Sequence, residues 1–198
     1  MKIMRFLLRV VLGGLFVGHG TQKLNGWFGG QGIDATASMF EGLGLRPGRR
    51  NAIAAGAAES GGGAALALGF ATPFASAALI GTMLTAIHRV HLKNGPWISN
   101  QGYEYNLMLV LAAALLAELG PGPVSVDNLL GTETSGPGWG LAALAMGGAG
   151  AFAVHQLAQS GAAAPVPAAT EPFQAANADA GVAGQAEETG RIPVGVAR

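Results

Sequence analysis

Five apolar segments dominate the sequence, and their lengths constrain the fold more than any other feature. They run over residues 3–20, 51–70, 72–87, 106–120 and 138–158. Each is close to the ~20 residues that an α-helix needs to cross a hydrocarbon layer of ~30 Å. Backbone N–H and C=O groups find no water in lipid, so segments of this kind must be helical there. We therefore predict an all-α protein, a polytopic bundle of transmembrane helices.

The composition favours a membrane protein over a soluble domain. Half of the 198 residues are hydrophobic and only 11% are charged, whereas soluble domains average about 25% charged residues. The 11 basic and 11 acidic residues balance, so no global field indicates nucleic acid as a partner. The absence of cysteine excludes disulfides, thiolate nucleophiles and cysteine-ligated metals. We expect the lipid bilayer as partner and a multi-pass protein of the cell inner membrane.

The chain divides into three parts by composition. Residues 1–131 contain four of the apolar segments and predict a four-helix membrane domain. Residues 132–158 add a fifth transmembrane helix at the C-terminal side. Residues 159–198 are rich in Ala, Pro and Gly with almost no large apolar residues. Such a tail cannot bury enough surface to offset the entropy of ordering, so we predict it to be disordered.

Small residues at helical spacing indicate where the helices meet, because small side chains let backbones approach closely in lipid. The candidate stripes are Gly14 and Gly18; Ala57, Gly61, Ala65 and Gly69; Ala77, Gly81 and Thr85; and Ala143, Gly147 and Ala151. We predict that these stripes form the helix contacts of a tightly packed bundle.

Polar residues of four segments gather at one membrane face, because successive helices alternate in direction. The residues at this face include His19, Lys23, His88, Arg89, His91 and Glu104. Glu59 lies eight residues down the second segment from the same face, about 12 Å deep at 1.5 Å per residue. The sequence therefore predicts a pocket at this face, with a carboxylate beneath it.

Glu59 has two interpretations. A carboxylate inside a membrane costs several kcal/mol unless it is paired or protonated, so such residues are commonly functional. In the functional interpretation Glu59 moves protons. In the structural one it bonds to a neighbouring helix, with Arg9 as the candidate partner, since Arg9 starts about 9 Å in from the opposite face and has a long side chain.

Two further features bear on ligand binding. His88 and His91 are three residues apart and, with Glu104 or His19, could ligate a metal or haem iron. Interfacial histidines more often bond to headgroups or carbonyls, so we predict no metal site. Lys23 suits either a lysine that reaches out of the membrane or a group that binds an anionic substrate or a quinone carbonyl.

Four motifs in order resemble those of the DoxX family, small four-helix bacterial membrane proteins. They are "RVVLGGLFVGHGTQKL", "GAAESGGGAALALGFATP", "GYE" before the fourth segment, and "GPGPVSVDNLLG", and together they cover residues 5–131. The fifth segment and the tail fall outside the resemblance. The resemblance implies special status for Arg9, His19, Gly20, Lys23, Glu59, Gly63, Glu104, Gly120, Gly122, Ser125 and Asp127.

Two function classes follow. Some members of the family resemble subunits of quinone-linked oxidoreductases, including one acting on thiosulfate, which implies a redox-linked membrane subunit with quinone as substrate. Glu59 and Glu104 would then move protons, while His19 or Lys23 would hold a carbonyl oxygen. The remaining candidate ligand-binding residues are Arg9, His88 and His91. The chain shows no cofactor motif of its own, so a partner redox subunit would donate the electrons.

The alternative is a non-catalytic membrane anchor for soluble partners, since other members of the family associate with oxidative-stress enzymes. If the chain is an enzyme, the resemblance implies a subunit of a quinone-linked membrane oxidoreductase. An anchor should tolerate Glu59→Gln in its binding function, whereas a proton-handling site should not.

Overall fold

All regular structure in the described part of the chain is helical. The computed structural model describes residues 2–161. The α-helices are α1 (Lys2–Asn25), α2 (Gly32–Gly42), α3 (Gly48–Leu68), α4 (Thr72–Ala86), α5 (Glu104–Leu119), α6 (Val126–Leu130) and α7 (Pro137–Gly161). Shorter turns are η1 (Trp27–Gly29), η2 (Ile87–His91), η3 (Leu92–Asn94) and η4 (Ile98–Asn100). The predicted all-α class is confirmed. The tail predicted to be disordered lies, from residue 162 on, outside the described residues.

Each of the five apolar segments forms one long helix: α1, α3, α4, α5 and α7. The sequence gives no comparable signal for α2, which is 11 residues long and lies in the connection between the first two segments. The short helix α6 does carry a signal. Its N-cap is Ser125, whose side chain accepts a hydrogen bond from the Asn128 amide at 3.1 Å, as the preference of serine for this position predicts.

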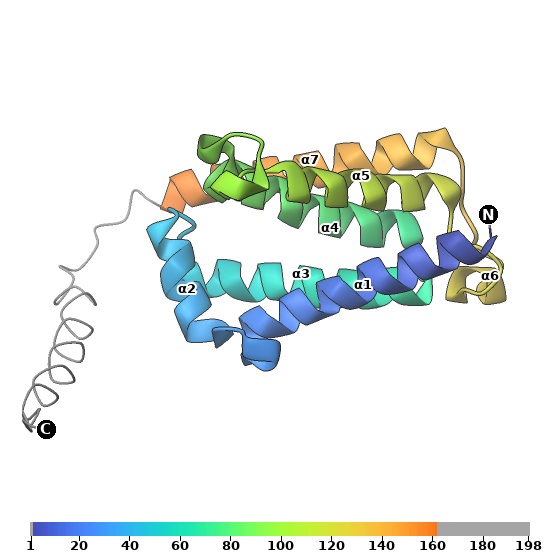
Figure 1. Cartoon of the computed structure of the whole chain (residues 1–198), viewed down its shortest axis with the longest axis horizontal. Coiled ribbons are helices and arrows are strands. Elements are labelled where there is room, and N and C mark those ends of the chain that lie inside the picture. The colour runs from blue at the N-terminus through green and yellow to red at the C-terminus, as the bar shows by residue number, and fades with distance from the viewer. Residues whose placement is uncertain (1, 162–198) are drawn as a thin grey trace, which may run out of the picture. The chain divides into compact units, whose positions relative to one another are not determined.

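The long helices form two layers (Figure 1). Helices α1 and α3 pack along each other in one layer, and α4, α5 and α7 form the second. Helix α2 crosses the first layer at one end and packs mainly on α3. Helix α6 lies at the opposite end, close to the N-terminus of α1. The two ends of the bundle therefore differ in what covers them.

Two helices of the described part are long and apolar enough to cross a membrane by length and composition, Lys2–Asn25 and Pro137–Gln159. A bundle with four spans plus a fifth is thus not confirmed. The reason lies in the individual helices. Helices α4 and α5 have 15 and 16 residues, or about 22–24 Å at 1.5 Å per residue, less than a ~30 Å hydrocarbon layer. Helix α3 is long enough but carries Arg49, Arg50 and Glu59.

Glycines bring α1 and α3 into backbone contact, on faces other than those predicted. A Cβ atom at Gly13 would lie 2.4 Å from the Gly63 carbonyl oxygen, and one at Gly20 would lie 2.6 Å from that of Gly56. The contact glycines are seven residues apart on each helix, which is two helical turns. The predicted pair Gly14 and Gly18 is wrong as a contact face, because a Cβ at either position meets nothing within 4 Å.

The stripes predicted on α4 and α7 do meet. A Cβ at Gly147 would lie 2.5 Å from Ile80 Cγ2 and 2.9 Å from the Ala77 carbonyl oxygen, and one at Gly81 would lie 3.3 Å from the Gly147 carbonyl oxygen. Helix α7 therefore packs tightly on α4 as part of the bundle.

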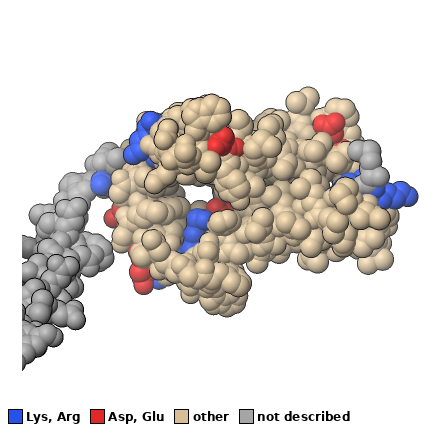
Figure 2. Space-filling model, viewed as in Figure 1, with Lys and Arg blue, Asp and Glu red and all other residues tan. Residues whose placement is uncertain are grey.

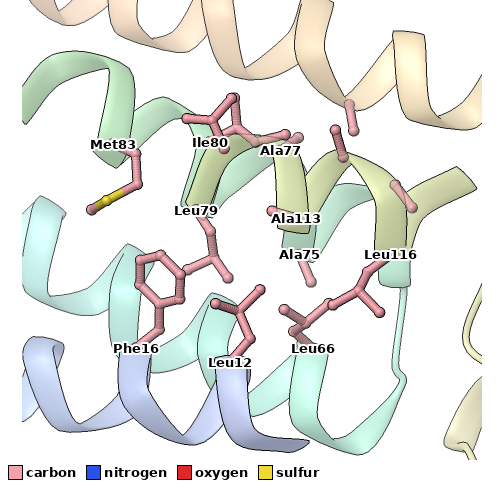
Figure 3. Close-up of a cluster of buried hydrophobic side chains, with 14 residues drawn as sticks. Leu12, Phe16, Leu66, Ala75, Ala77, Leu79, Ile80, Met83, Ala113 and Leu116 are labelled. Carbon is pink, nitrogen blue, oxygen red and sulfur yellow. The ribbon is translucent and has the colours of Figure 1, made fainter. Parts of the chain in front are cut away.

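Between the layers lies one cluster of buried apolar side chains (Figure 3). Leu12 and Phe16 of α1 point toward Leu79 of α4, and Leu66 of α3 and Leu116 of α5 meet beside them. This core fills the end and the middle of the bundle near α6. Toward α2 the layers separate, and a cavity takes the place of the core.

Candidate functional site

A cavity of about 630 Å³ lies between the two layers, at the end where α2 packs. Figure 2 shows an opening there, with basic and acidic atoms at its edge. Its walls are mostly apolar and come from both layers: α2 supplies Met39 and Phe40, α4 supplies Ala77 and Met83, and α7 supplies Met146. The cavity lies at the end where the sequence places the polar residues, but its lining is more apolar than that expectation.

A buried ion pair closes one wall of this cavity. Lys23 Nζ at the end of α1 lies 2.6 Å from Glu59 Oε2 on α3, and both residues line the cavity. The Glu59 side chain is 4% exposed and that of Lys23 is 26% exposed. The close approach of α1 and α3 through Gly20 and Gly56 sets the distance between the two backbones. The carboxylate is thus held away from water, while the ammonium group remains within reach of the cavity.

Glu59 therefore has a partner other than the one considered from the sequence. Arg9 does not bond to Glu59: it lies 14 residues before Lys23 on α1, about 21 Å along the helix. Its guanidinium donates to the carbonyl oxygens of Ala67, Pro121 and Val124. Arg9 is 2% exposed and does not line the cavity, so the structure places it outside the candidate site.

Arg9 belongs to a polar cluster at the opposite end of the bundle. Asp127 accepts hydrogen bonds from the amides of Ala71 and Thr72 at 2.8 and 3.2 Å, and from the Thr72 hydroxyl at 3.1 Å. Arg5 donates to the Leu119 carbonyl oxygen at 2.6 Å. The buried donors and acceptors of this cluster are paired with one another, and it encloses no cavity among those found in the described part.

Of the other predicted site residues, His19 and His91 line the cavity, whereas His88 and Glu104 do not. His19 is exposed, and its Nδ1 lies 3.1 Å from Gln22 Oε1. His91 Nδ1 lies 2.8 Å from the Gln101 carbonyl oxygen, a bond in which the histidine donates.

Glu104 holds the loop before α5. Its carboxylate accepts a hydrogen bond from the Ile98 amide at 2.5 Å, while its own amide donates to the Pro96 carbonyl oxygen at 2.9 Å. Glu104 therefore has a structural partner and no direct access to the cavity, so the structure does not bring it together with Glu59.

No group of three or more His, Asp or Glu side chains is arranged to hold a metal ion in the part of the chain that the structure describes. His88 instead packs edge to face on His155 of α7, with ring centroids 4.7 Å apart. His88 and His91 thus face different surroundings, and neither joins Glu104 or His19.

Two more polar residues line the cavity, neither of which was among the candidate ligand-binding residues. Arg89 of η2 and Asn106 of α5 line it, and the Asn106 amide nitrogen lies 3.4 Å from Met83 Sδ. Asn106 is the first residue of the fourth apolar segment, so its place at the polar end of the bundle could have been predicted from the sequence. Arg89 was expected at the same membrane face, between His88 and His91, and the structure places it in the wall of the cavity there, on the π-helical turn η2.

These features define a class of protein. An all-helical bundle with two helices long and apolar enough to cross a membrane, and with many apolar side chains exposed along α1 and α7, is a membrane protein.

The family follows from comparison with known proteins. The DoxX family model matches residues 4–92, and this part of the chain belongs to the DoxX family. The match covers α1 to η2 and thus includes Lys23, Glu59 and His91, whereas the motifs around Glu104 and Ser125 lie beyond it. No curated protein and no solved structure gives a significant match.

Proposed function

We propose that this protein is a multi-pass protein of the cell inner membrane whose cavity binds a quinone, as the membrane subunit of a redox system. The observation that carries the proposal is the buried Lys23–Glu59 pair in the wall of an otherwise largely apolar cavity of about 630 Å³. A quinone combines an apolar ring and tail with two carbonyl oxygens. Apolar walls with few polar groups at defined positions suit such a ligand.

In this proposal five helices cross the bilayer: α1, α3, α4 continued by η2, α5 and α7. Helix α4 runs directly into η2, so residues 72–91 form one continuous helical segment. Helix α3 is rich in Ala and Gly and carries charged residues, so it is less apolar than a typical membrane span. Helix α1 covers one of its faces and shields the Glu59 carboxylate.

Lys23 and Glu59 have distinct roles in the proposed chemistry. The Lys23 ammonium donates a hydrogen bond to one quinone oxygen, and Glu59 keeps Lys23 charged and oriented. Reduction of a quinone to a quinol takes up two electrons and two protons. The electrons come from the redox group of a partner protein. The proton for the oxygen next to Lys23 passes from Lys23, which is reprotonated from the side of the cavity where His19 is exposed. The proton for the second oxygen comes from water at the opening of the cavity.

The test is quinone occupancy in protein purified in lipid nanodiscs, measured by extraction and mass spectrometry. We expect near-stoichiometric quinone in the wild type and at least about a tenfold loss in Glu59→Gln, which corresponds to about 1.4 kcal/mol. The matched control is Asp34→Asn, which removes the carboxylate of the exposed pair with Arg49 and should leave occupancy unchanged. If wild-type protein neither retains quinone nor rebinds added decyl-ubiquinone or menadione, the proposal is wrong.

One observation favours the alternative of a non-catalytic anchor. Glu59 and Glu104 both have partners, Lys23 and the Ile98 amide, so both carboxylates serve the structure as they stand. An anchor needs no more than this. It predicts that Glu59→Gln at matched folding co-purifies with the same soluble enzymes as the wild type, and that no quinone accompanies either protein.

A further inference from the structure

The polar side chains that line the larger cavity are not equally well paired. Most of them bond to a nitrogen or oxygen atom within the described residues. Apart from the Lys23–Glu59 pair, those with such partners are His19, Asn51, Thr82, Thr85, Arg89 and His91. Tyr105 is exposed, so water can reach its hydroxyl. Asn106 is the exception, because it is buried and its side chain has no nitrogen or oxygen partner in the described part of the chain.

The side-chain amide of Asn106 has unused hydrogen-bonding capacity. The residue is only 8% exposed. As far as the chain is described, the one bond of this side chain runs from Nδ2 to Met83 Sδ at 3.4 Å. A thioether is a weak acceptor and cannot donate, so the amide nitrogen and not the oxygen faces Met83. One N–H group and the oxygen therefore remain unused, and burying an amide in that state costs free energy.

The Asn106 oxygen can be reached from the cavity. In the described part of the chain, the side-chain oxygens that are both fully enclosed and unpaired are those of Ser60 and Ser76. The Asn106 oxygen is unpaired as well, but it is not among these enclosed atoms, and the residue lines the cavity. A molecule in the cavity can thus bond to this amide.

Asn106 and Lys23 lie on opposite walls of the cavity at a similar depth. Lys23 is the third-last residue of α1 in the first layer, and Asn106 is the third residue of α5 in the second. Both of these helix ends lie at the α2 end of the bundle (Figure 1). The two carbonyl oxygens of a para-quinone point in opposite directions from the ring. A ring that lies between the layers therefore presents one oxygen to each wall.

We propose that Asn106 binds the second oxygen of the quinone, opposite Lys23, and makes the cavity selective for para-quinones over compounds with one carbonyl group. This inference rests on the proposed quinone site. The free Nδ2–H group donates to the carbonyl oxygen of the oxidised ring, and Oδ1 accepts from the hydroxyl group of the reduced ring. Asn106 thus suits both redox states. Because an amide does not titrate, Asn106 determines specificity and supplies no proton.

The test compares two ligands of similar size in lipid nanodiscs: menadione, which has two para carbonyl oxygens, and 1-tetralone, which has one. Bound ligand is measured by equilibrium dialysis, extraction and mass spectrometry, and the value for protein-free discs is subtracted because both compounds partition into lipid. We expect the wild type to bind menadione at least about fivefold more tightly, the effect of one hydrogen bond. Asn106→Leu should remove this difference. It should leave 1-tetralone binding unchanged, because the single oxygen of that ligand bonds to the charged Lys23.

Two control variants address other polar residues of the cavity wall. Asn51→Leu removes an amide that already bonds to the Pro47 carbonyl oxygen, and it should preserve the difference between the ligands. Arg89→Gln should preserve it too, since Arg89 Nη2 is held by His155 and Nη1 lies beside Gly44, 3.7 Å from where a Cβ would be. If Arg89→Gln removed the difference and Asn106→Leu did not, Arg89 would bind the second oxygen and the proposal would be wrong.

The remaining outcomes separate this inference from the quinone site itself. The wild-type comparison needs no variant, so a folding defect in Asn106→Leu does not end the test. Equal affinity of the wild type for menadione and 1-tetralone would overturn the role of Asn106 and leave the quinone site standing. Equal losses of both ligands in folded Asn106→Leu would do the same. If the wild type bound neither ligand, the quinone site and this inference would both be wrong.

Discussion

Each end of the bundle contains a charged side chain from α1, but the partners and surroundings of the two charges differ. At the α6 end, Arg9 is 2% exposed and is surrounded by three carbonyl acceptors with Asp127 nearby. At the α2 end, Lys23 meets a single carboxylate beside a cavity of about 630 Å³. All three nitrogens of the Arg9 guanidinium donate to carbonyl oxygens, so this charge holds the fold together. The Lys23 ammonium makes one bond, to Glu59, and two of its three N–H groups remain available to a ligand.

The glycines follow the same division. At the α6 end, Gly69 and Gly122 have φ angles of +66° and +81° and make room for arginine side chains. A Cβ at Gly69 would lie 2.5 Å from Arg9 Nη1. At the α2 end, Gly20 and Gly56 bring two backbones together instead. One set of glycines accommodates side chains at the closed end, and the other sets the helix spacing at the open end.

The largest effect is expected from Arg9→Met. Removing the guanidinium leaves the carbonyl oxygens of Ala67, Pro121 and Val124 without their donor and Asp127 without the nearby positive charge, so we expect a loss of about 3–5 kcal/mol in the free energy of unfolding. The measurement is unfolding in mixed detergent micelles. Arg49→Met is the control, because its pair with Asp34 is exposed and worth at most about 1 kcal/mol. Equal losses in Arg9→Met and Arg49→Met would mean that the buried contacts of Arg9 add no more stability than the exposed ion pair of Arg49.

The second prediction concerns the asymmetry of the Lys23–Glu59 pair. Lys23→Met leaves a carboxylate that is 4% exposed without a partner, whereas Glu59→Gln leaves an ammonium that is 26% exposed and can reach water. We expect losses of about 3 kcal/mol and about 1 kcal/mol respectively. Unfolding of both variants and of the double variant measures the coupling. A larger loss for Glu59→Gln would mean that Lys23, not Glu59, is the inaccessible partner.

The third prediction tests the spacing of α1 and α3. It compares one substitution on the face of α3 that contacts α1 with one on a face that does not. Gly63→Ala places a Cβ 2.6 Å from the Gly13 carbonyl oxygen, and overpacking of this kind costs about 1–3 kcal/mol. Gly61→Ala meets nothing within 4 Å, and it should be neutral or stabilising by up to about 1 kcal/mol through helix propensity. Thermal unfolding of the two variants separates the faces, and a destabilised Gly61→Ala would place the contact on the face first predicted from the sequence.

The smallest effect is expected at the cap of α6. Ser125→Ala removes the acceptor for the Asn128 amide and should cost about 1 kcal/mol. Ser38→Ala is the control, because its residue is exposed and its hydroxyl bonds to the Asp34 carbonyl oxygen within its own helix. Binding of quinone should not change in either variant. If Ser125→Ala lowered quinone occupancy per folded protein, the two ends would be coupled.

The sequence predicted local features well and contacts between helices less well. Five apolar runs became five helices. Ser125 is the N-cap of α6, a local feature that depends only on neighbouring residues. Glu59 was identified as buried from its place in an apolar run. Its partner was not, because pairing depends on how α3 is rotated about its axis, and one residue of rotation moves a side chain by about 100°.

The face by which α1 meets α3 illustrates the same limit. Gly13 and Gly14 are adjacent, and only one of them contacts α3. Four-residue spacing singled out Gly14 and Gly18, whereas the contact uses a seven-residue spacing from Gly13 to Gly20. Helix α2 was missed for another reason, since a helix that packs across the end of a bundle needs no long apolar run.

Gly150 of α7 has a wider consequence. It lines the larger cavity from a helix outside the residues matched to the family, and nothing lies within 4 Å of where its Cβ would be. Any side chain added there would project into unoccupied space and reduce the volume open to a guest molecule. A lineage could therefore retune what the cavity admits by changing one residue of an accessory helix, while Lys23, Glu59 and the domain around them stay the same.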